Sequence, residues 1–424
     1  MKIITAALIG AGQRGADVYA DFSLRNCHEM KFAAVAEPDD KRRERFAQKH
    51  AVKESMVFSD WRDLLRQPKA ADAVFICTQD SMHYEPAVCA LEKGYHVFLE
   101  KPMSNVLGEC LEIGRAAEQY PDRIFTVAHV LRFTPFFQKI KDIIDQGRIG
   151  NIISVQHNEN VGYWHQAHSF VRGNWRKSET SSPMILAKSC HDMDILLWLI
   201  GKHCRKISSF GSLSYFTEQN APPKVPERCL DGCAFQESCP YFAPKIYLEA
   251  MDSWQAEVLQ SVVSSDQSSE GILQALREGP YGRCVFKCDN DVVDHQVATL
   301  EFEDNITAVF TMCGHTSECS RTIKIMGTAG EIRGHMEKQV IEVLPFNERN
   351  REYIILDIEK EGHGGGDYRI MKSFTGLIRR GAKSDNITSP EIAVESHIMS
   401  FAAEKSRLEK GRVVDINKFW KTHI

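Results

Sequence analysis

A glutamate and a lysine follow a short apolar run, and this lysine is well suited to acid–base chemistry. The run Val97-Phe98-Leu99 leads directly into Glu100 and Lys101. If the run is a strand of a parallel sheet, Lys101 lies at its carboxyl end, which borders the ligand crevice of such sheets. An uncharged amine there could take the proton of an alcohol while a hydride leaves the same carbon. A surface salt bridge that ends the strand is the alternative interpretation.

A glycine-rich turn near the start of the chain has the spacing of a dinucleotide fingerprint. It follows the apolar stretch 3–9 and precedes a segment of helical periodicity. The first glycine permits the turn, the second lets a pyrophosphate approach the backbone, and the third brings helix against strand. The predicted cofactor-binding residues of the turn are Gly10, Gly12, Gln13, Arg14 and Gly15. A glycine turn without a ligand is the alternative.

An acidic residue stands where such a fingerprint requires one. Glu37 ends the second apolar run, 22 residues after Gly15. Its carboxylate is placed to accept hydrogen bonds from the adenosine ribose, and it would repel a 2′-phosphate. The sequence therefore favours NAD over NADP as cofactor, although Arg42 and Arg43 lie close enough to weaken that preference.

The elements that position these residues fall into two parts. Up to about residue 125, apolar runs alternate with segments of helical periodicity, which predicts a doubly wound parallel sheet. The expected strands are 3–9, 32–36, 73–77, 96–99 and 124–127, and the expected helices are 16–24, 41–50, 84–92 and 106–119. We therefore expect a dinucleotide-binding domain over residues 1–125.

Residues 126–424 have a different pattern of apolar and polar residues, which predicts a second α/β domain with an open, mainly antiparallel sheet. Alternating runs with tight turns between some of them are typical of such a sheet. They occur at 152–158, 207–215, 293–303, 306–313 and 321–326, with turns at 303–305 and 327–330. An insertion at about 217–290 begins rich in proline and cysteine and turns helical over 246–277. Helices are expected at 135–146 and 390–410.

Taken together, these motifs resemble the Gfo/Idh/MocA oxidoreductases. The fingerprint, the segment 78–83, Glu100-Lys101-Pro102 and the segment 191–194 occur in the order seen in that family. The resemblance extends from residue 2 to the C-terminal helix, except for the insertion. It implies a Rossmann domain, a second domain whose sheet makes homo-oligomer contacts, as a dimer or tetramer, and hydride transfer between NAD(P) and a ring carbon of a sugar, inositol or related polyol.

The resemblance also implies roles for single residues. Lys101 matches the catalytic base, His191 matches the histidine that faces the substrate hydroxyl, and Asp194 follows it as in many relatives. Arg132 matches an arginine after the sixth strand, on the substrate side. The residues matching the nicotinamide half of the cleft are Thr78 and His83, and Glu100 and Lys101 of the Glu-Lys-Pro motif are also expected to bind the cofactor.

One departure from the family pattern concerns the catalytic centre. Many relatives carry an aspartate four residues before the histidine, but Ala187 and then Lys188 stand here. Lys101 can act as a base only when uncharged, and a nearby cation favours that form. Lys188 could supply that cation, as could an oxidised nicotinamide ring, or it could hold an anionic substrate such as a sugar acid.

Two further segments are candidates for contact with a sugar. Aromatic rings pack on the apolar faces of pyranosides, and an aromatic, polar stretch lies between a strand and a helix. Its candidate residues are Tyr163, Trp164, Trp175 and Arg176, for which plain core or surface roles are the alternative. The glycine-rich turn 362–367 is either a substrate loop or a tight connection, with Asp367 as a possible helix N-cap.

The insertion carries closely spaced cysteines. Cys229, Cys233 and Cys239 lie in its proline-rich part, and Cys284 and Cys288 flank the return to the sheet. In a reducing compartment such thiols stay free or hold structural Zn²⁺. Cys284 is the expected fourth ligand, because Cys288 would lie about 13 Å farther along an extended strand. Free or oxidisable thiols are the alternative.

Composition and charge exclude several classes of function. The net charge is −5, from 52 basic and 57 acidic residues, which leaves no cationic surplus for nucleic acid. No apolar run of 18 residues is present, so we expect no membrane helix and place the protein in the cytoplasm. An NAD-dependent glycosidase is an alternative to the dehydrogenase. A dinucleotide-sensing regulator ranks lowest, because such regulators lose the lysine that stands here at position 101.

Overall fold

Six short apolar segments form a parallel sheet in the N-terminal part of the chain, in the order β3-β2-β1-β4-β5-β6. They are β1 (Ile4–Ile9), β2 (Met30–Ala36), β3 (Val57–Phe58), β4 (Ala73–Ile76), β5 (His96–Leu99) and β6 (Phe125–Val127). Strand β4 is buried at every position, as expected for a central strand covered on both faces. The computed structural model describes residues 3–249, 253–346, 351–357, 362–381 and 385–422.

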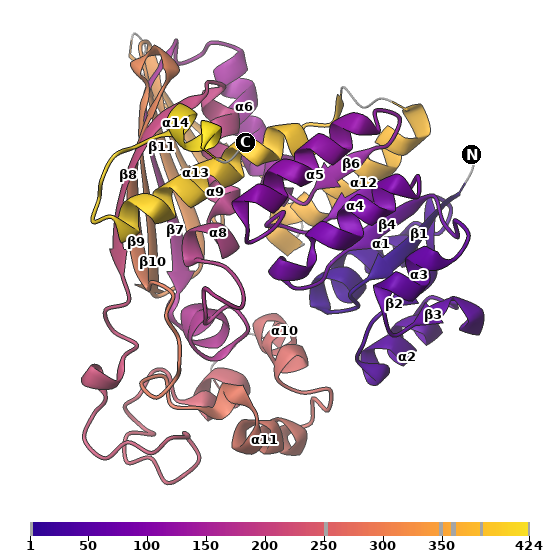
Figure 1. The fold of residues 1–424 in the computed structure, drawn as a ribbon. Helices are drawn as coiled ribbons and strands as arrows, with labels where there is room; N and C mark the ends of the chain where they lie inside the picture. Colours follow the sequence, from indigo (N-terminus) through magenta and orange to yellow (C-terminus); the bar gives the residue numbers. More distant parts are fainter. Residues whose placement is uncertain (1–2, 250–252, 347–350, 358–361, 382–384, 423–424) are drawn as a thin grey trace.

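Helices cover both faces of this sheet (Figure 1). One face carries η1 (Gln13–Tyr19), α1 (Ala20–Arg25), α2 (Asp40–Lys49) and α12 (Gly366–Arg380). The other carries α3 (Trp61–Arg66), α4 (Tyr84–Glu92), α5 (Leu107–Gln119) and part of α13 (Pro390–Leu408). The predicted doubly wound sheet is therefore confirmed.

A nine-stranded sheet forms the second part, in the order β14-β13-β12-β11-β7-β10-β9-β8-β15. Its strands are β7 (Ile152–Gly162), β8 (Cys204–Ser212), β9 (His295–Phe302), β10 (Thr307–Thr316), β11 (Ser320–Gly327), β12 (Gly330–His335), β13 (Val340–Pro345), β14 (Glu352–Ile355) and β15 (Val414–Asp415). All neighbours pair antiparallel except β7 and β10. The predicted mainly antiparallel sheet is confirmed. The helices beside it include α6 (Pro135–Asp145), α8 (Met184–Ala187), α9 (Cys190–Ile200) and α14 (Ile416–Lys421).

The insertion has a small core of its own. Helices α10 (Ser253–Val263) and α11 (Ser269–Glu278) fall within the stretch predicted to be helical. Apolar and cysteine side chains of the insertion pack against each other and against the π-helical segment η5 (Gln166–Arg172). In Figure 1 the insertion lies beyond one end of the nine-stranded sheet.

Two C-terminal helices join the parts. Phe374 of α12 packs edge-on against Phe75 and Phe98 of the first sheet, with ring centroids 5.5 and 5.4 Å apart. Helix α13 lies against both α5 and β8. The boundary near residue 125 stays a prediction, but α12 belongs to the first core although it comes late in the chain. None of the described helices is long and apolar enough to cross a membrane.

Candidate active site

The glycine turn between β1 and η1 has the shape that a dinucleotide requires. Gly10 has a φ of +88°, and a Cβ there would meet the Cys77 carbonyl oxygen at 2.6 Å. A Cβ on Gly15 would lie 2.3 Å from the carbonyl oxygen of Gly10. A Cβ on Gly12 would meet nothing within 4 Å. The backbone is thus open at Gly12, where the fingerprint brings a pyrophosphate close to the helix N-terminus.

Glu37 lies beside this turn at the end of β2. It is buried, and its carboxylate accepts hydrogen bonds from the backbone N–H groups of Ala11, at 2.6 Å, and Asp39, at 3.0 Å. The guanidinium of Arg43 donates to the Glu37 carbonyl oxygen at 2.6 Å and pairs with Asp40. Arg43 therefore has partners within the protein. Glu37 is the charged residue at the end of β2 that contacts the turn directly.

Glu100 ties the glycine turn to the end of β5. Its carboxylate accepts hydrogen bonds from Arg14 Nε at 2.7 Å and from the Tyr19 hydroxyl at 2.6 Å. Burial would raise the pKa of Glu100, but the charges of Arg14 and Lys101, together with the hydrogen bonds from Tyr19 and Arg14, hold it below its ordinary value. Arg14 also pairs with Asp367 at 2.8 Å. The acid of the Glu-Lys-Pro motif is therefore an ionised anchor for the predicted cofactor turn.

Lys101 and His191 lie at the carboxyl edge of the first sheet. The Lys101 amine donates to the carbonyl oxygen of Ala187, at the end of α8, at 2.8 Å. His191 is buried in the first turn of α9, and its Nδ1 has no hydrogen-bond partner within the described residues. Burial, followed by the charge of Lys101, lowers the pKa of His191 well below its ordinary value. A neutral imidazole with a free ring nitrogen therefore stands near the lysine.

The residues that replace the family aspartate are accounted for by this geometry. Ala187 offers its carbonyl oxygen to the lysine, which orients the amine without neutralising a charge. Lys188 lies 3.3 Å from the buried carboxylate of Glu159, which also pairs with Arg321. Lys188 is thus paired inside the protein, and its contact with an anionic substrate stays a prediction.

Two further buried histidines lie near His191 and are not among the residues predicted from the sequence. The ring centroids of His129 and His191 are 5.9 Å apart, and those of His129 and His397 are 5.5 Å apart. His397 donates from Nδ1 to the Ala393 carbonyl oxygen and accepts at Nε2 from the Met103 N–H, which fixes a neutral tautomer. His129 comes two residues after the last residue of β6, so its place near a strand end was the available signal.

Because these histidines are buried, we expect the folded protein to lose stability at mildly acidic pH. Burial lowers the pKa of His129 to about 4, whereas the unfolded chain binds the proton near pH 6.5. Stability is therefore full above pH 6.5 and falls as the pH drops toward 4. For His129 the loss between pH 7 and pH 5 is about 2 kcal/mol. Urea unfolding at the two pH values measures it, and His129→Gln should lose less stability on acidification than the unmodified chain. An equal loss would contradict this assignment.

Arg132, predicted on the substrate side, has partners inside the protein. It is buried and forms a two-pronged pair with Asp194, with Nε–Oδ2 and Nη2–Oδ1 both 2.7 Å. Its remaining Nη1 donates to the carbonyl oxygen of Ile387. With these groups engaged inside the protein, Arg132 braces α9, and its contact with substrate stays a prediction.

The residues predicted on the nicotinamide side brace two loops. His83 is buried between the carbonyl oxygens of Pro102, 2.7 Å from Nδ1, and Thr78, 3.2 Å from Nε2. The Thr78 hydroxyl donates to the carbonyl oxygen of Met82. Both residues thus shape the sheet edge near Lys101, and direct contact with the cofactor stays a prediction.

The predicted sugar rim is divided between several partners. Tyr163 and Trp164 pack against the core of the insertion. Trp175 donates from its indole nitrogen to Asp80 at 3.2 Å, and Arg176 pairs with Asp289 at 2.9 Å. Each of these four residues thus has partners within the protein, and their contact with substrate stays a prediction.

The glycine-rich turn 362–367 reaches the fingerprint. Asp367 is not the N-cap expected of it, because Gly365 occupies that position. Instead, the Asp367 carboxylate binds Arg14 and lies 2.9 Å from His363 Nδ1. The His363 ring centroid is 6.1 Å from that of His191. This turn therefore closes one side of the candidate site.

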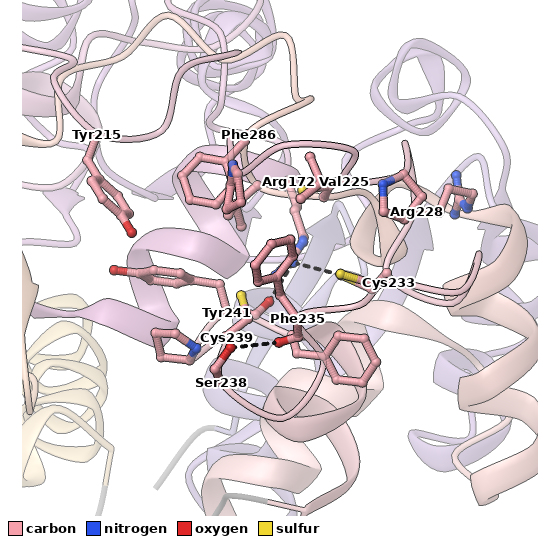
Figure 2. Close-up of a pocket in the computed structure, with 17 residues that line it drawn as sticks. Arg172, Tyr215, Val225, Arg228, Cys233, Phe235, Ser238, Cys239, Tyr241 and Phe286 are labelled. Carbon is pink, nitrogen blue, oxygen red and sulfur yellow. Dashed lines mark hydrogen bonds between the residues drawn. The ribbon is translucent and has the colours of Figure 1, made fainter. Parts of the chain in front are cut away.

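The four cysteines predicted as metal ligands belong to the insertion. Cys229, Cys233, Cys239 and Cys284 line one cavity of the insertion (Figure 2). The expectation of an extended strand after Cys284 is wrong, because the Lys287 N–H returns to the Cys284 carbonyl oxygen and forms a turn. Among the described residues, no three Cys, His, Asp or Glu side chains form a group ready to hold a metal ion.

Comparison with known families matches most of the chain. Residues 4–129 match the NAD-binding Rossmann fold of the Gfo/Idh/MocA oxidoreductase family, and residues 141–376 match its C-terminal alpha/beta domain. The oxidoreductase candidate YteT of Bacillus subtilis (strain 168) is 25% identical over 73% of this chain and 73% of its own length. A 2,7-anhydro-N-acetylneuraminate hydratase of Mediterraneibacter gnavus is 25% identical over 50% of this chain and 53% of its own length.

Solved structures share the fold over nearly the whole chain. A levoglucosan dehydrogenase in complex with NADH and levoglucosan has a TM-score of 0.72 at 18% identity, covering 98% of this chain and 100% of its own. A scyllo-inositol dehydrogenase of Lactobacillus casei with bound NAD(H) and scyllo-inositol has a TM-score of 0.67 at 18% identity, with the same coverage.

Proposed function

Because the chain belongs to the Gfo/Idh/MocA oxidoreductase family, we propose that it transfers a hydride between NAD and the carbon of a ring hydroxyl in a sugar, inositol or glycoside. The observation that carries this proposal is that the Lys101 amine, held by the Ala187 carbonyl oxygen, lies close enough to the buried His191 for its charge to lower the pKa of that histidine, while the glycine turn is open at Gly12. The two structural relatives that bind a nicotinamide cofactor together with a polyhydroxylated ring support the substrate class.

Lys101 and His191 then have distinct roles. The nicotinamide, when bound, supplies the hydride acceptor. Lys101 takes the proton of the substrate hydroxyl as the carbon–hydrogen bond breaks and the carbon–oxygen double bond forms. The Ala187 carbonyl oxygen holds the amine in place, and the unpartnered nitrogen of His191 can hydrogen-bond the substrate hydroxyl.

The cofactor preference depends on Glu37. Glu37→Ser removes the carboxylate next to the glycine turn, and we expect the ratio of kcat/KM for NAD to that for NADP to fall by about 10- to 100-fold. Steady-state kinetics with both cofactors measures the ratio. Asp39→Asn is the matched control, because Asp39 caps α2 through the Arg42 N–H. An unchanged ratio for Glu37→Ser would remove Glu37 from cofactor selection.

Substrate class is tested by a direct screen. The purified chain is incubated with NAD⁺ and with inositols, hexoses, sugar acids and methyl glycosides, and NADH formation is followed by absorbance. Turnover of at least one ring polyol supports the proposal. NAD binding without oxidation or transformation of any compound would contradict the substrate class.

A redox-assisted elimination or hydration is the second candidate. One protein similar to this chain is a hydratase. Its name describes a reaction without net oxidation of the substrate. In this case transient oxidation of one ring carbon would make the neighbouring proton acidic. This second reaction is identified by incubating the protein with a glycoside in deuterated water. The glycoside should be converted without accumulation of NADH, and deuterium should appear at the neighbouring carbon.

A homo-oligomer through the nine-stranded sheet is part of the proposal. The strand register places large exposed side chains on the outer face of the sheet, away from the helices. They include Phe210, Val309, Tyr353 and Ile355. Exposed apolar side chains on one face, with Lys324, Arg333 and Glu342 among them, favour association with a second copy. The cytoplasmic location also stays a prediction.

A further inference from the structure

A second histidine lies close to His191, on the glycine-rich turn that precedes α12. The ring centroid of His363 is 6.1 Å from that of His191, and no hydrogen bond of the described residues joins the two rings. A hydroxyl oxygen can form a hydrogen bond of about 2.8 Å with a ring nitrogen, so a polyol placed between the rings can contact both. The side chain of His363 is 35% exposed, which leaves it accessible to a ligand.

The backbone of this turn holds His363 in an unusual conformation. Three consecutive residues have positive φ angles, which are +47° at His363, +60° at Gly364 and +81° at Gly365. A Cβ on Gly366 would lie 2.5 Å from the Val130 carbonyl oxygen, so the turn packs tightly against the segment after β6. The left-handed region suits glycine better than histidine, and residues held there often belong to functional sites.

Asp367 orients the His363 ring. Its Oδ2 lies 2.9 Å from His363 Nδ1. Burial would raise the pKa of Asp367, but the charge of Arg14 and the neighbouring His363 hold it well below its ordinary value. An ionised carboxylate can only accept a hydrogen bond, so Nδ1 carries the hydrogen and Nε2 of the neutral ring is an acceptor. No hydrogen bond of the described residues uses that Nε2.

The same carboxylate holds the predicted cofactor turn. Arg14 donates from Nη2 to Asp367 Oδ1 at 2.8 Å and from Nε to Glu100 at 2.7 Å. Arg14 lies between Gly12 and Gly15 of the fingerprint, and Glu100 directly precedes Lys101. Asp367 therefore links His363 to the cofactor turn and, through Arg14 and Glu100, to the strand end that carries the lysine.

We propose that His363 contacts the substrate through Nε2, by accepting a hydrogen bond from the hydroxyl on the ring carbon next to the one oxidised, and that Asp367 positions it. In a ring polyol the oxygens on neighbouring carbons lie side by side. A substrate whose reacting hydroxyl meets Nδ1 of His191 therefore brings a neighbouring hydroxyl toward His363. This inference rests on the proposed function and narrows its substrate class to rings with hydroxyls on neighbouring carbons.

His363→Asn tests the substrate contact. Asparagine tolerates a positive φ, and its amide can still donate to Asp367 from the place of Nδ1, but it has no atom at the place of Nε2. With the ring polyol of the screen that has the highest kcat/KM, we expect kcat/KM to fall about 3- to 30-fold and NAD affinity to stay unchanged.

Deoxy analogues of that polyol identify the hydroxyl. For one of the two analogues that lack a hydroxyl beside the reacting carbon, the unmodified chain and His363→Asn should have equal kcat/KM, because the contact is already absent. The matched control is His28→Asn, whose side chain is 74% exposed, and it should leave kcat/KM unchanged with every substrate. An equal fall with the parent polyol and both analogues, or no fall at all, would overturn the substrate contact.

Two measurements test the positioning role of Asp367. Asp367→Asn should lower kcat/KM as His363→Asn does and should also weaken NAD affinity about 10-fold in calorimetry, because Arg14 loses a charged partner. In the unmodified chain labelled with ¹⁵N-histidine, the NMR signals that disappear in His363→Asn should belong to a ring with its hydrogen on Nδ1.

A hydrogen on Nε2 of His363, or unchanged NAD affinity in Asp367→Asn, would overturn the positioning role. Neither measurement needs a substrate. A chain that transforms no ring polyol would therefore refute the proposed function and the substrate contact, whereas the orientation of His363 by Asp367 would still be judged by the NMR spectrum.

Discussion

Replacing Lys101 by methionine is expected to lower kcat by about 10²- to 10⁴-fold while NAD binding changes little. Methionine keeps the length and apolar stem of the side chain but cannot accept a proton. The amine contacts the Ala187 carbonyl oxygen, and it holds neither the glycine turn nor Glu37. The two quantities are measured by NADH formation with a substrate from the screen and by calorimetry with NAD.

The matched control is Lys93→Met at the exposed end of α4. It should leave both kcat and NAD affinity unchanged. Unreduced turnover in Lys101→Met would exclude the lysine from proton transfer. A parallel loss of NAD binding would show instead that Lys101 supports the cofactor site.

The second large effect concerns stability. Arg132→Met leaves the Asp194 carboxylate buried without its partner, and we expect a loss of about 3–5 kcal/mol in the free energy of unfolding. Urea unfolding at pH 7 measures it. The double variant Arg132→Met/Asp194→Leu removes both charges and should recover much of that loss.

An exposed ion pair provides the comparison. Arg62→Met breaks the pair with Glu85, whose side chains are 48% and 63% exposed, and should change stability by less than about 1 kcal/mol. If Arg132→Met raised KM for substrate and left stability unchanged, Arg132 would contact substrate as its sequence match implied, and the bracing role would be wrong.

The architecture was predictable because burial leaves a strong pattern. The first-sheet strands are short apolar runs covered on both faces, and the alternating runs after residue 150 match strands with one buried face. Strand β3 has only two residues and was too short to show a period. The late helix α12 could not be assigned to the first core, because its partners lie more than 230 residues earlier in the chain.

The candidate site was predictable where the backbone demands a residue type. Gly10 and Gly15 sit where a Cβ would collide with backbone, and such constraints leave a fixed spacing in the sequence. The partner of each charge was not predictable. Whether Arg132 faces substrate or Asp194, and whether Glu100 faces cofactor or Arg14, depends on side chains that meet only in the folded chain.

Solving the structure of the chain with NAD bound would test the central idea most directly. We expect the pyrophosphate over the open backbone at Gly12 and the nicotinamide end beside Lys101 and His191. A cofactor whose nicotinamide lies away from these two side chains, or the absence of any bound cofactor at saturating concentration, would contradict the account.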